Sequence, residues 1–187
     1  MDKNELIKAI EAVLFAGGEP VSKDRIATVF GLKDKETERI MQEVIEHIAQ
    51  SDLGIELIKL DDSYQFVSKT EYAEYIKSAY EIKRRTPLSP AAFEVLAVIA
   101  YNQPVTRSFI EQVRGVDCSA VVSTLIEKEL IEERGRLELP GRPLLYGTTK
   151  NFLRCFSLSS LDDLPQLPDK TPTANDYAEQ LEVSEDI

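Results

Sequence analysis

The sequence predicts a mainly α-helical protein with small β-hairpin wings, built from two tandem winged-helix domains. One observation is an internal echo, in which 100–116 repeat 16–32 at a spacing of 84 residues with six of 17 positions identical. Another is that each copy has three segments with helical apolar spacing, followed by two short alternating segments typical of a hairpin. Solenoid repeats recur every 20 to 50 residues or so. The longer spacing therefore indicates two small domains.

The first copy predicts three helices, a hairpin and a further helix. Apolar residues on one face predict a helix over 5–16 that Gly17-Gly18 ends. Ser22 is placed to cap a second helix over 23–30, because Pro20 prevents the first helix from continuing. The remaining predicted elements are a helix over 34–50, strands over 55–60 and 64–67, and a helix over 71–83 capped by Thr70.

The second copy predicts a similar order. Ser89 is a helix N-cap and Pro90 suits the first helical position. The helix over 91–101 is apolar nearly all round, so we expect it to be central and covered on several sides. The later predicted elements are helices over 107–113 and 119–130, strand-like segments 131–133 and 137–139 around Gly135, a turn over 140–143, an extended segment 144–146 and a helix over 151–156.

Composition sets the expected domain boundaries. The first domain spans 1–83, a charged linker ending near a proline spans 84–88, and the second domain spans 89–164. The last residues, 165–187, are acidic, contain proline and have few large apolar side chains, which predicts a disordered tail. This tail carries a net charge of −5, nearly half of the −11 of the whole chain.

Motifs for catalysis and metal binding are weak. His47 is the only histidine, and its acidic and apolar neighbours on a helix predict a solvated or half-packed side chain. Cys118 and Cys155 are too few and too far apart for a metal knuckle or a disulfide framework. No glycine-rich phosphate loop follows a strand, and no serine, histidine and acid set is credible. We therefore expect no enzymatic activity, no cofactor and no metal.

No segment indicates a membrane or secreted protein. The most apolar run, 95–101, is far shorter than the roughly 20 residues that cross a bilayer. The first residues lead directly into a capped amphipathic helix instead of a signal peptide. A cytoplasmic protein is expected.

Charge on the third helix of each copy bears on DNA binding, a common role of winged helices. A recognition helix needs Lys, Arg, Asn or Gln facing phosphates and base edges. Acidic residues outnumber basic ones in 34–47, and 117–130 offers one cation, Lys128. Sequence-specific DNA binding is therefore not expected, and a DNA-binding transcription regulator stays the alternative function.

Protein binding is the remaining role. Tyrosine and arginine are typical interface anchors, and the turn after the first helix of the second copy brings Tyr101, Gln103 and Arg107 together. The residues leave an alternative open, in which Tyr101 closes the domain core and Arg107 forms a surface salt bridge. The first copy offers an apolar helix stripe that is either all core or partly a dimer seam. This stripe consists of Leu6, Ile10, Val13 and Leu14.

Several stretches closely resemble the bacterial segregation and condensation protein B family. They occur in the order and spacing of that family over about residues 5–165. The residues that carry the resemblance are Ile10 to Pro20, Leu88 to Arg107, Ile110, Val113 to Val116, Gly141 to Thr149, Phe152, Leu153 and Leu161 to Pro165. The sequence departs from the family pattern at 117–120 and at Ser157, which affects local contacts at a helix start.

The resemblance implies a non-enzymatic subunit of the bacterial condensin-like complex. Family members pair through their N-terminal winged-helix domains, and the homodimer binds the kleisin subunit, segregation and condensation protein A. The kleisin bridges the ATPase heads of the structural-maintenance-of-chromosomes protein, so the chain would act in chromosome condensation and segregation at the nucleoid. With this partner, we expect the kleisin contact on the second copy. The expected contact residues are Tyr101, Gln103, Arg107, Arg114, Arg142 and Tyr146.

Overall fold

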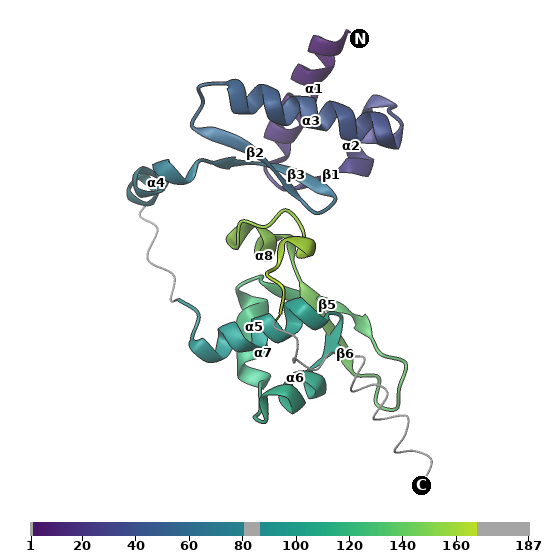
Figure 1. The fold of residues 1–187 in the computed structure, drawn as a ribbon, viewed down its shortest axis with the longest axis vertical. Helices are drawn as coiled ribbons and strands as arrows, with labels where there is room; N and C mark the ends of the chain where they lie inside the picture. Colours follow the sequence, from purple (N-terminus) through teal and green to yellow (C-terminus); the bar gives the residue numbers. More distant parts are fainter. Residues whose placement is uncertain (1, 81–86, 168–187) are drawn as a thin grey trace. The chain divides into compact units, whose positions relative to one another are not determined.

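The computed structural model describes residues 2–80 and 87–167, and the chain divides into two compact units, Met1–Arg85 and Thr86–Ile187. In each unit, three helices pack with a three-stranded antiparallel sheet and a further helix follows the last strand (Figure 1). This confirms the predicted fold class of two tandem winged helices. Residues 84–86 of the expected linker and 168–187 of the expected tail lie outside the described residues.

In the first unit, a side chain caps the start of each of the first two helices. Asp2 accepts a hydrogen bond from the backbone N of Glu5 and caps the first helix, and Ser22 caps the second. Gly31 ends that second helix in the left-handed conformation, φ 65°, which glycine adopts without strain. The elements are α1 (Lys3–Gly17), β1 (Val21–Ser22), α2 (Lys23–Phe30), α3 (Asp34–Gln50), β2 (Ile55–Leu60), β3 (Ser63–Ser68), the 3-10 turn η1 (Thr70–Tyr72) and α4 (Ala73–Ala79).

The core of the first unit lies between α1, α2, α3 and the sheet, whose strand order is β1-β3-β2. Val21 lies opposite Tyr64, and Ile55 lies opposite Ser68. Burying each large apolar side chain contributes about 1.5–3 kcal/mol, so this cluster stabilises the small unit. Its buried members are Ile7, Ile10, Leu14, Val21, Ile26, Ile40, Met41, Val44, Ile48, Leu57 and Tyr64.

The second unit repeats this plan around a more deeply buried first helix. Ser89 accepts a hydrogen bond from the backbone N of Ala92, and Pro90 is the first residue of that helix. The sheet order is β4-β6-β5, with a register shift between Glu133 and Gly135. The elements are α5 (Pro90–Asn102), β4 (Val105–Thr106), α6 (Arg107–Arg114), α7 (Ser119–Glu127), β5 (Ile131–Arg136), β6 (Leu144–Thr148), α8 (Lys150–Cys155) and the 3-10 turn η2 (Leu161–Asp163).

Several boundaries differ from the sequence expectation. The strands β1 and β4 are two residues long, too short for an alternating pattern to reveal. Thr70 lies inside η1 and caps no helix, and α4 begins only at Ala73; the expected helical residues 81–83 lie outside the described residues. Helix α7 ends at Glu127 because the chain turns through Glu129 with φ 55°. Residues 137–139 form a loop of the wing, since β5 continues through Gly135 to Arg136.

The two copies are one residue out of step within their first helices. Leu14 and Ile99 each lie three residues before the end of their helix and occupy equivalent buried positions, yet they are 85 positions apart. Val21 and Val105, which begin the short strands, are 84 positions apart. The loop between helix and strand is therefore one residue longer in the first unit, where Gly18 adopts φ 66°.

Candidate protein-interaction surfaces

Tyr101 lies half-buried near the end of α5 and fastens the C-terminal segment of the second unit. Its hydroxyl donates a hydrogen bond of 2.6 Å to the backbone carbonyl of Pro165. A half-buried tyrosine needs such a partner because an unpaired hydroxyl there would cost free energy. Tyr101 thus joins α5 to the segment that follows α8.

Gln103 and Tyr146 are placed inside the second unit. The Nε2 of Gln103 donates to Thr148 Oγ1 (2.9 Å), and its Oε1 accepts from the backbone N of Thr148 (2.7 Å). Tyr146 lies on β6 opposite Val105 and is 8% exposed. These two side chains hold the wing strand against the rest of the unit and offer little surface to a partner.

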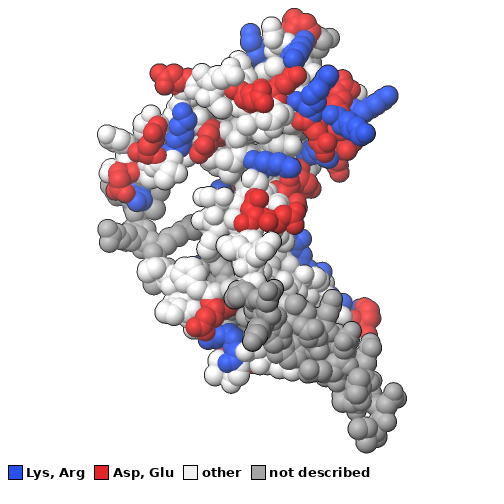
Figure 2. Space-filling view, viewed as in Figure 1, with Lys and Arg blue, Asp and Glu red and all other residues white. Residues whose placement is uncertain are grey.

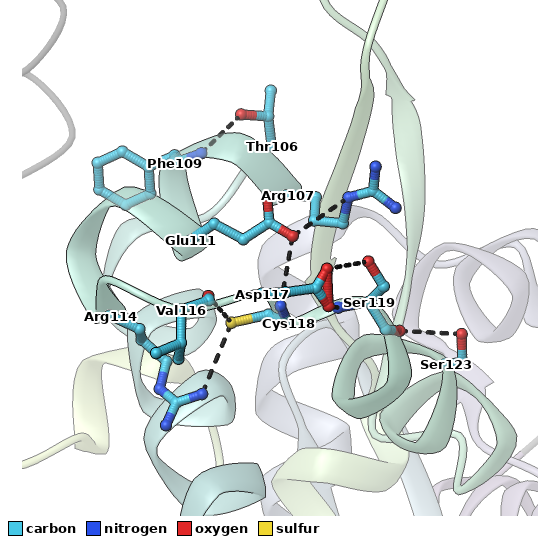
Figure 3. Close-up of polar contacts among 10 residues, drawn as sticks. All are labelled: Thr106, Arg107, Phe109, Glu111, Arg114, Val116, Asp117, Cys118, Ser119 and Ser123. Atoms are coloured by element: carbon cyan, nitrogen blue, oxygen red, sulfur yellow. Dashed lines mark hydrogen bonds and ion pairs between the residues drawn. The ribbon is translucent and has the colours of Figure 1, made fainter.

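Arg107 sits at the corner between α6 and α7, where polar contacts fix the start of α7 (Figure 3). Its Nε lies 3.5 Å from Oε1 of Glu111, and the same Glu111 oxygen accepts from the backbone N of Cys118 (3.3 Å). Asp117 accepts hydrogen bonds from the backbone N and the hydroxyl of Ser119. These hydrogen bonds, with the nearby Arg107 charge, lower the pKa of Asp117. Arg107 keeps 56% of its side chain exposed.

Arg114, by contrast, is a structural link between α6 and α5. Only 14% of its side chain is exposed, and Nη2 lies 2.6 Å from Oε2 of Glu94. Figure 3 shows its guanidinium also pointing to the buried Cys118, whose Sγ lies 3.6 Å from Nη1. Hydrogen bonds to Cys118 and Glu94 raise the pKa of Arg114. Arg114 is therefore held within the unit by two partners.

Arg142 lies on the loop of the wing, close in sequence to Tyr146 but far along the chain from the four expected contact residues between 101 and 114. It is exposed and forms an ion pair of 2.6 Å with Glu138. The same loop exposes Leu137 and Leu139. Among the described residues, none of the six expected contact residues hydrogen-bonds to another. The structure leaves Arg107 and Arg142 as the accessible members.

Acidic residues outnumber basic ones on α3, and α7 carries no Lys or Arg, so neither third helix resembles a DNA-reading helix. On α7 the hydroxyls of Ser123 and Thr124 donate to carbonyls of their own helix. In the first unit, Lys23 is bound by Asp34 (2.8 Å) and Glu38 (2.9 Å) of α3, and these hydrogen bonds raise the pKa of Lys23. Figure 2 shows acidic and basic side chains interleaved over the first unit instead of a continuous basic patch. This arrangement does not favour binding along a phosphate backbone.

The structure divides the apolar stripe of α1 between core and surface. Ile10 and Leu14 are 0% and 2% exposed inside the unit's own core, whereas Leu6 and Val13 are half-buried. Phe15, which the sequence reasoning missed, is 75% exposed on the same helix. Helical spacing of apolar residues identifies the side of α1 that faces the core. Phe15 lies outside that side, so the spacing gave no signal for it.

Three tyrosines at the end of the first unit were also missed. Tyr72 in η1, Tyr75 in α4 and Tyr80 just after α4 are 40%, 76% and 76% exposed. Single exposed apolar side chains are ordinary on protein surfaces, but three aromatics within nine residues form a patch. Their clustering was visible in the sequence, but their exposure depends on which segments of the fold cover this helix.

Two further properties of the described residues bear on metal binding and on membranes. Within 2–80 and 87–167, no three His, Cys, Asp or Glu side chains are grouped to hold a metal ion. No helix among these residues is long and apolar enough to cross a membrane. His47 lies 2.7 Å from Glu11 and joins α3 to α1 with its side chain half exposed.

Comparison with known proteins gives a consistent result. The family model described as segregation and condensation complex subunit ScpB matches residues 8–167. A segregation and condensation protein B from Alkaliphilus oremlandii is 47% identical over 90% of this chain and 91% of its own length. The crystal structure of ScpB from Mycobacterium tuberculosis is 32% identical, with 84% of this chain and 98% of that chain covered and a TM-score of 0.41.

A further solved structure covers only part of the chain. It is described as a dimer of the ScpB N-terminal domain complexed with ScpA peptide, and it is 27% identical. The match covers 41% of this chain and 95% of that chain, with a TM-score of 0.39. The family assignment therefore rests on the family model and on sequence identity.

Proposed function

The chain belongs to the segregation and condensation protein B family, and on this premise we propose that it is a non-enzymatic adaptor of a bacterial chromosome segregation and condensation complex. The family match over residues 8–167 carries the proposal, because it spans both winged-helix units. The adaptor works in the cytoplasm at the nucleoid. It binds the kleisin subunit, segregation and condensation protein A, which bridges the ATPase heads of the structural-maintenance-of-chromosomes protein.

The first unit is proposed to pair two copies of the chain. Its helix α1 keeps Ile10 and Leu14 for the core but leaves Phe15 exposed and Leu6 and Val13 half-buried. Exposed apolar side chains are ordinary when single and mark interfaces when they gather in a patch. Leu6 packs against the unit's own core, so we propose Phe15 as the main residue of α1 in the dimer seam.

The second unit is proposed to contact the kleisin through Arg107 and Arg142. Arg107 keeps 56% and Arg142 64% of its side chain exposed, and each has an acidic neighbour on its own element or loop. Exposed ion pairs contribute roughly 0–1 kcal/mol to stability. A carboxylate of the partner can therefore replace the acidic neighbour of either arginine at little cost in free energy. Tyr101, Gln103, Arg114 and Tyr146 shape this surface from within instead of binding the partner directly.

Co-purification with the kleisin, with the stoichiometry measured by light scattering, tests the function. We expect a stable complex that contains two copies of this chain. Replacing both arginines, R107E with R142E, should weaken kleisin binding about tenfold or more, as for interface anchors. Arg154→Glu, an exposed arginine of the same unit, is the matched control and should bind normally. Absence of any complex with the kleisin would refute the proposal.

A mobility shift with a short duplex at low salt separates the adaptor from a DNA-binding regulator. The acidic chain, with a net charge of −11, and its cation-poor third helices should give no specific shift. A regulator that neutralises several phosphates would instead bind tightly at low salt and lose affinity steeply as salt rises. That second result would favour the regulator.

A further inference from the structure

The helix after the wing packs onto the first helix in the second unit. Phe152 and Leu153 of α8 are buried, and the ring of Phe156 meets that of Phe93 on α5 edge-on, with centroids 6.5 Å apart. The hydrogen bond from Tyr101 to the following segment lies eight residues further along the same side of α5. The chain's own C-terminal segment thus contacts α5 at Phe93 and at Tyr101, while Phe93 stays 49% exposed.

The corresponding side of α1 in the first unit is bare. With the one-residue offset between the helices, Phe15 corresponds to Ala100 of α5, and Ala16 corresponds to Tyr101. Phe15 is 75% exposed where Ala100 is 6% exposed. The other residues on this side of α1 are also exposed; they are Lys8, Ala12 and Ala16. The contact that closes the second unit is therefore missing from the first.

The helix that could make this contact is present, and only Ala73 and Ile76 of its residues are half-buried. Helix α4 follows the wing as α8 does, yet it buries none of its seven residues and has no side-chain cap. Figure 1 shows it standing away from α1 within the first unit. Its exposed stripe has helical spacing and runs through Tyr72, Tyr75 and Ala79. Isolated helices shorter than about 12 residues are marginal in water, so packing of this stripe would stabilise α4.

We propose that α4 of one copy packs onto the bare side of α1 of a second copy, and reciprocally. The exchange gives α4 the place that α8 takes on α5 inside the second unit. This proposal rests on the proposed homodimer and specifies that α4 and α1 are the elements in contact. A twofold axis makes both contacts at once, as in exchange of an identical element between protomers. It also covers the exposed Tyr72 and Tyr75, whereas direct pairing of α1 with α1 would leave them exposed.

Disulfide cross-linking between two tagged full-length chains tests the contact. One chain carries A12C and the other A79C, both with the exposed Cys155 changed to serine and the buried Cys118 kept. A disulfide between the two different chains is the expected result. The matched control replaces A12C by V29C, an exposed position on α2, and should give no such product.

Sedimentation of single variants gives an independent measurement. Phe15→Asp and Tyr75→Asp should each weaken the dimer about tenfold or more, while Val29→Asp should not. Circular dichroism melts of all three variants report whether each chain stays folded. Because all three side chains are exposed, their melting temperatures should stay close to that of the wild type.

The outcomes distinguish this contact from the dimer itself. A dimer that forms normally with F15D and Y75D, or that cross-links A12C to A12C but never to A79C, would overturn the exchange and leave the homodimer standing. A wild-type chain that stays monomeric at tens of micromolar would remove both.

Discussion

At the scale of single residues, a glutamine joins the wing to the end of the first helix in each unit. The glutamine belongs to the wing in the first unit and follows the helix in the second. In the first unit Gln65 of β3 donates to the carbonyl of Gly18 (2.9 Å). In the second, Gln103 follows α5 and reaches Thr148 of β6. Strand register places Gly147 where the first unit has Gln65. The missing side chain on β6 makes room for the glutamine that arrives from the helix end.

Gly147→Ala should therefore destabilise the second unit. An added Cβ would lie 2.7 Å from Oε1 of Gln103 and 2.9 Å from Cγ of Arg134. The amide would have to leave Thr148, and an unpaired buried polar group costs about 1–3 kcal/mol. Denaturant unfolding should detect this loss in the G147A chain. A double-mutant cycle with Gln103→Ala is the control, and fully additive losses would contradict coupling through Gln103.

At the scale of elements, most helices and strands could be predicted because cap residues and apolar periodicity coincide. Helix α2 and strand β2 have the expected bounds, 23–30 and 55–60. The two-residue strands β1 and β4 could not be predicted, since pairing with a distant strand creates them. Helix α4 begins two residues later than predicted because Thr70, the expected cap, lies inside the 3-10 turn η1.

The candidate surfaces were harder to predict than the fold for a related reason. Residue type identified Tyr101 and Arg114 as interface anchors. Only the fold reveals that Tyr101 already hydrogen-bonds to Pro165 and Arg114 to Glu94. Conversely, Phe15 was overlooked because periodicity finds the side of a helix that faces the core. Whether the opposite side is covered depends on segments far away in the chain.

Helix α7 provides a pH-dependent test at this scale. Hydrogen bonds from Ser119 lower the pKa of Asp117 below its ordinary value of 3.8. A depressed folded-state pKa contributes stability that is fully present above 3.8 and lost as pH falls through the lower folded value. Asp117→Ala should thus lower the melting temperature at pH 7, and the difference from wild type should shrink below pH 3.8.

Thermal melts of both chains between pH 3 and pH 7 measure this difference. Asp52→Ala, which removes another exposed aspartate, is the matched control for the loss of one carboxylate. A gap between wild type and D117A that stays constant down to pH 3 would contradict stabilisation by the ionised carboxylate.

At the scale of the whole molecule, we propose that one fold serves two tasks because its last helix is placed differently in the two units. In the second unit the residue after α8, Phe156, contacts Phe93 of α5, and the exposed Arg107 and Arg142 are the proposed kleisin contacts. The first unit leaves α1 and α4 open, which suits pairing between copies. The residues beyond 164 add a net charge of −5 to the chain.

Two truncations of the full chain separate this acidic tail from the segment that closes the second unit. A chain ending at Leu167 loses residues with a net charge of −5 but keeps the Pro165 carbonyl that accepts from Tyr101. Its melting temperature and kleisin binding should match those of the wild type. A chain ending at Leu164 loses that acceptor, and a lost hydrogen bond of this kind costs about 0.5–1.5 kcal/mol. Tyr101→Phe in the full chain should reproduce that loss, whereas equal melting of the two truncations would mean that the Tyr101 hydrogen bond does not stabilise the unit.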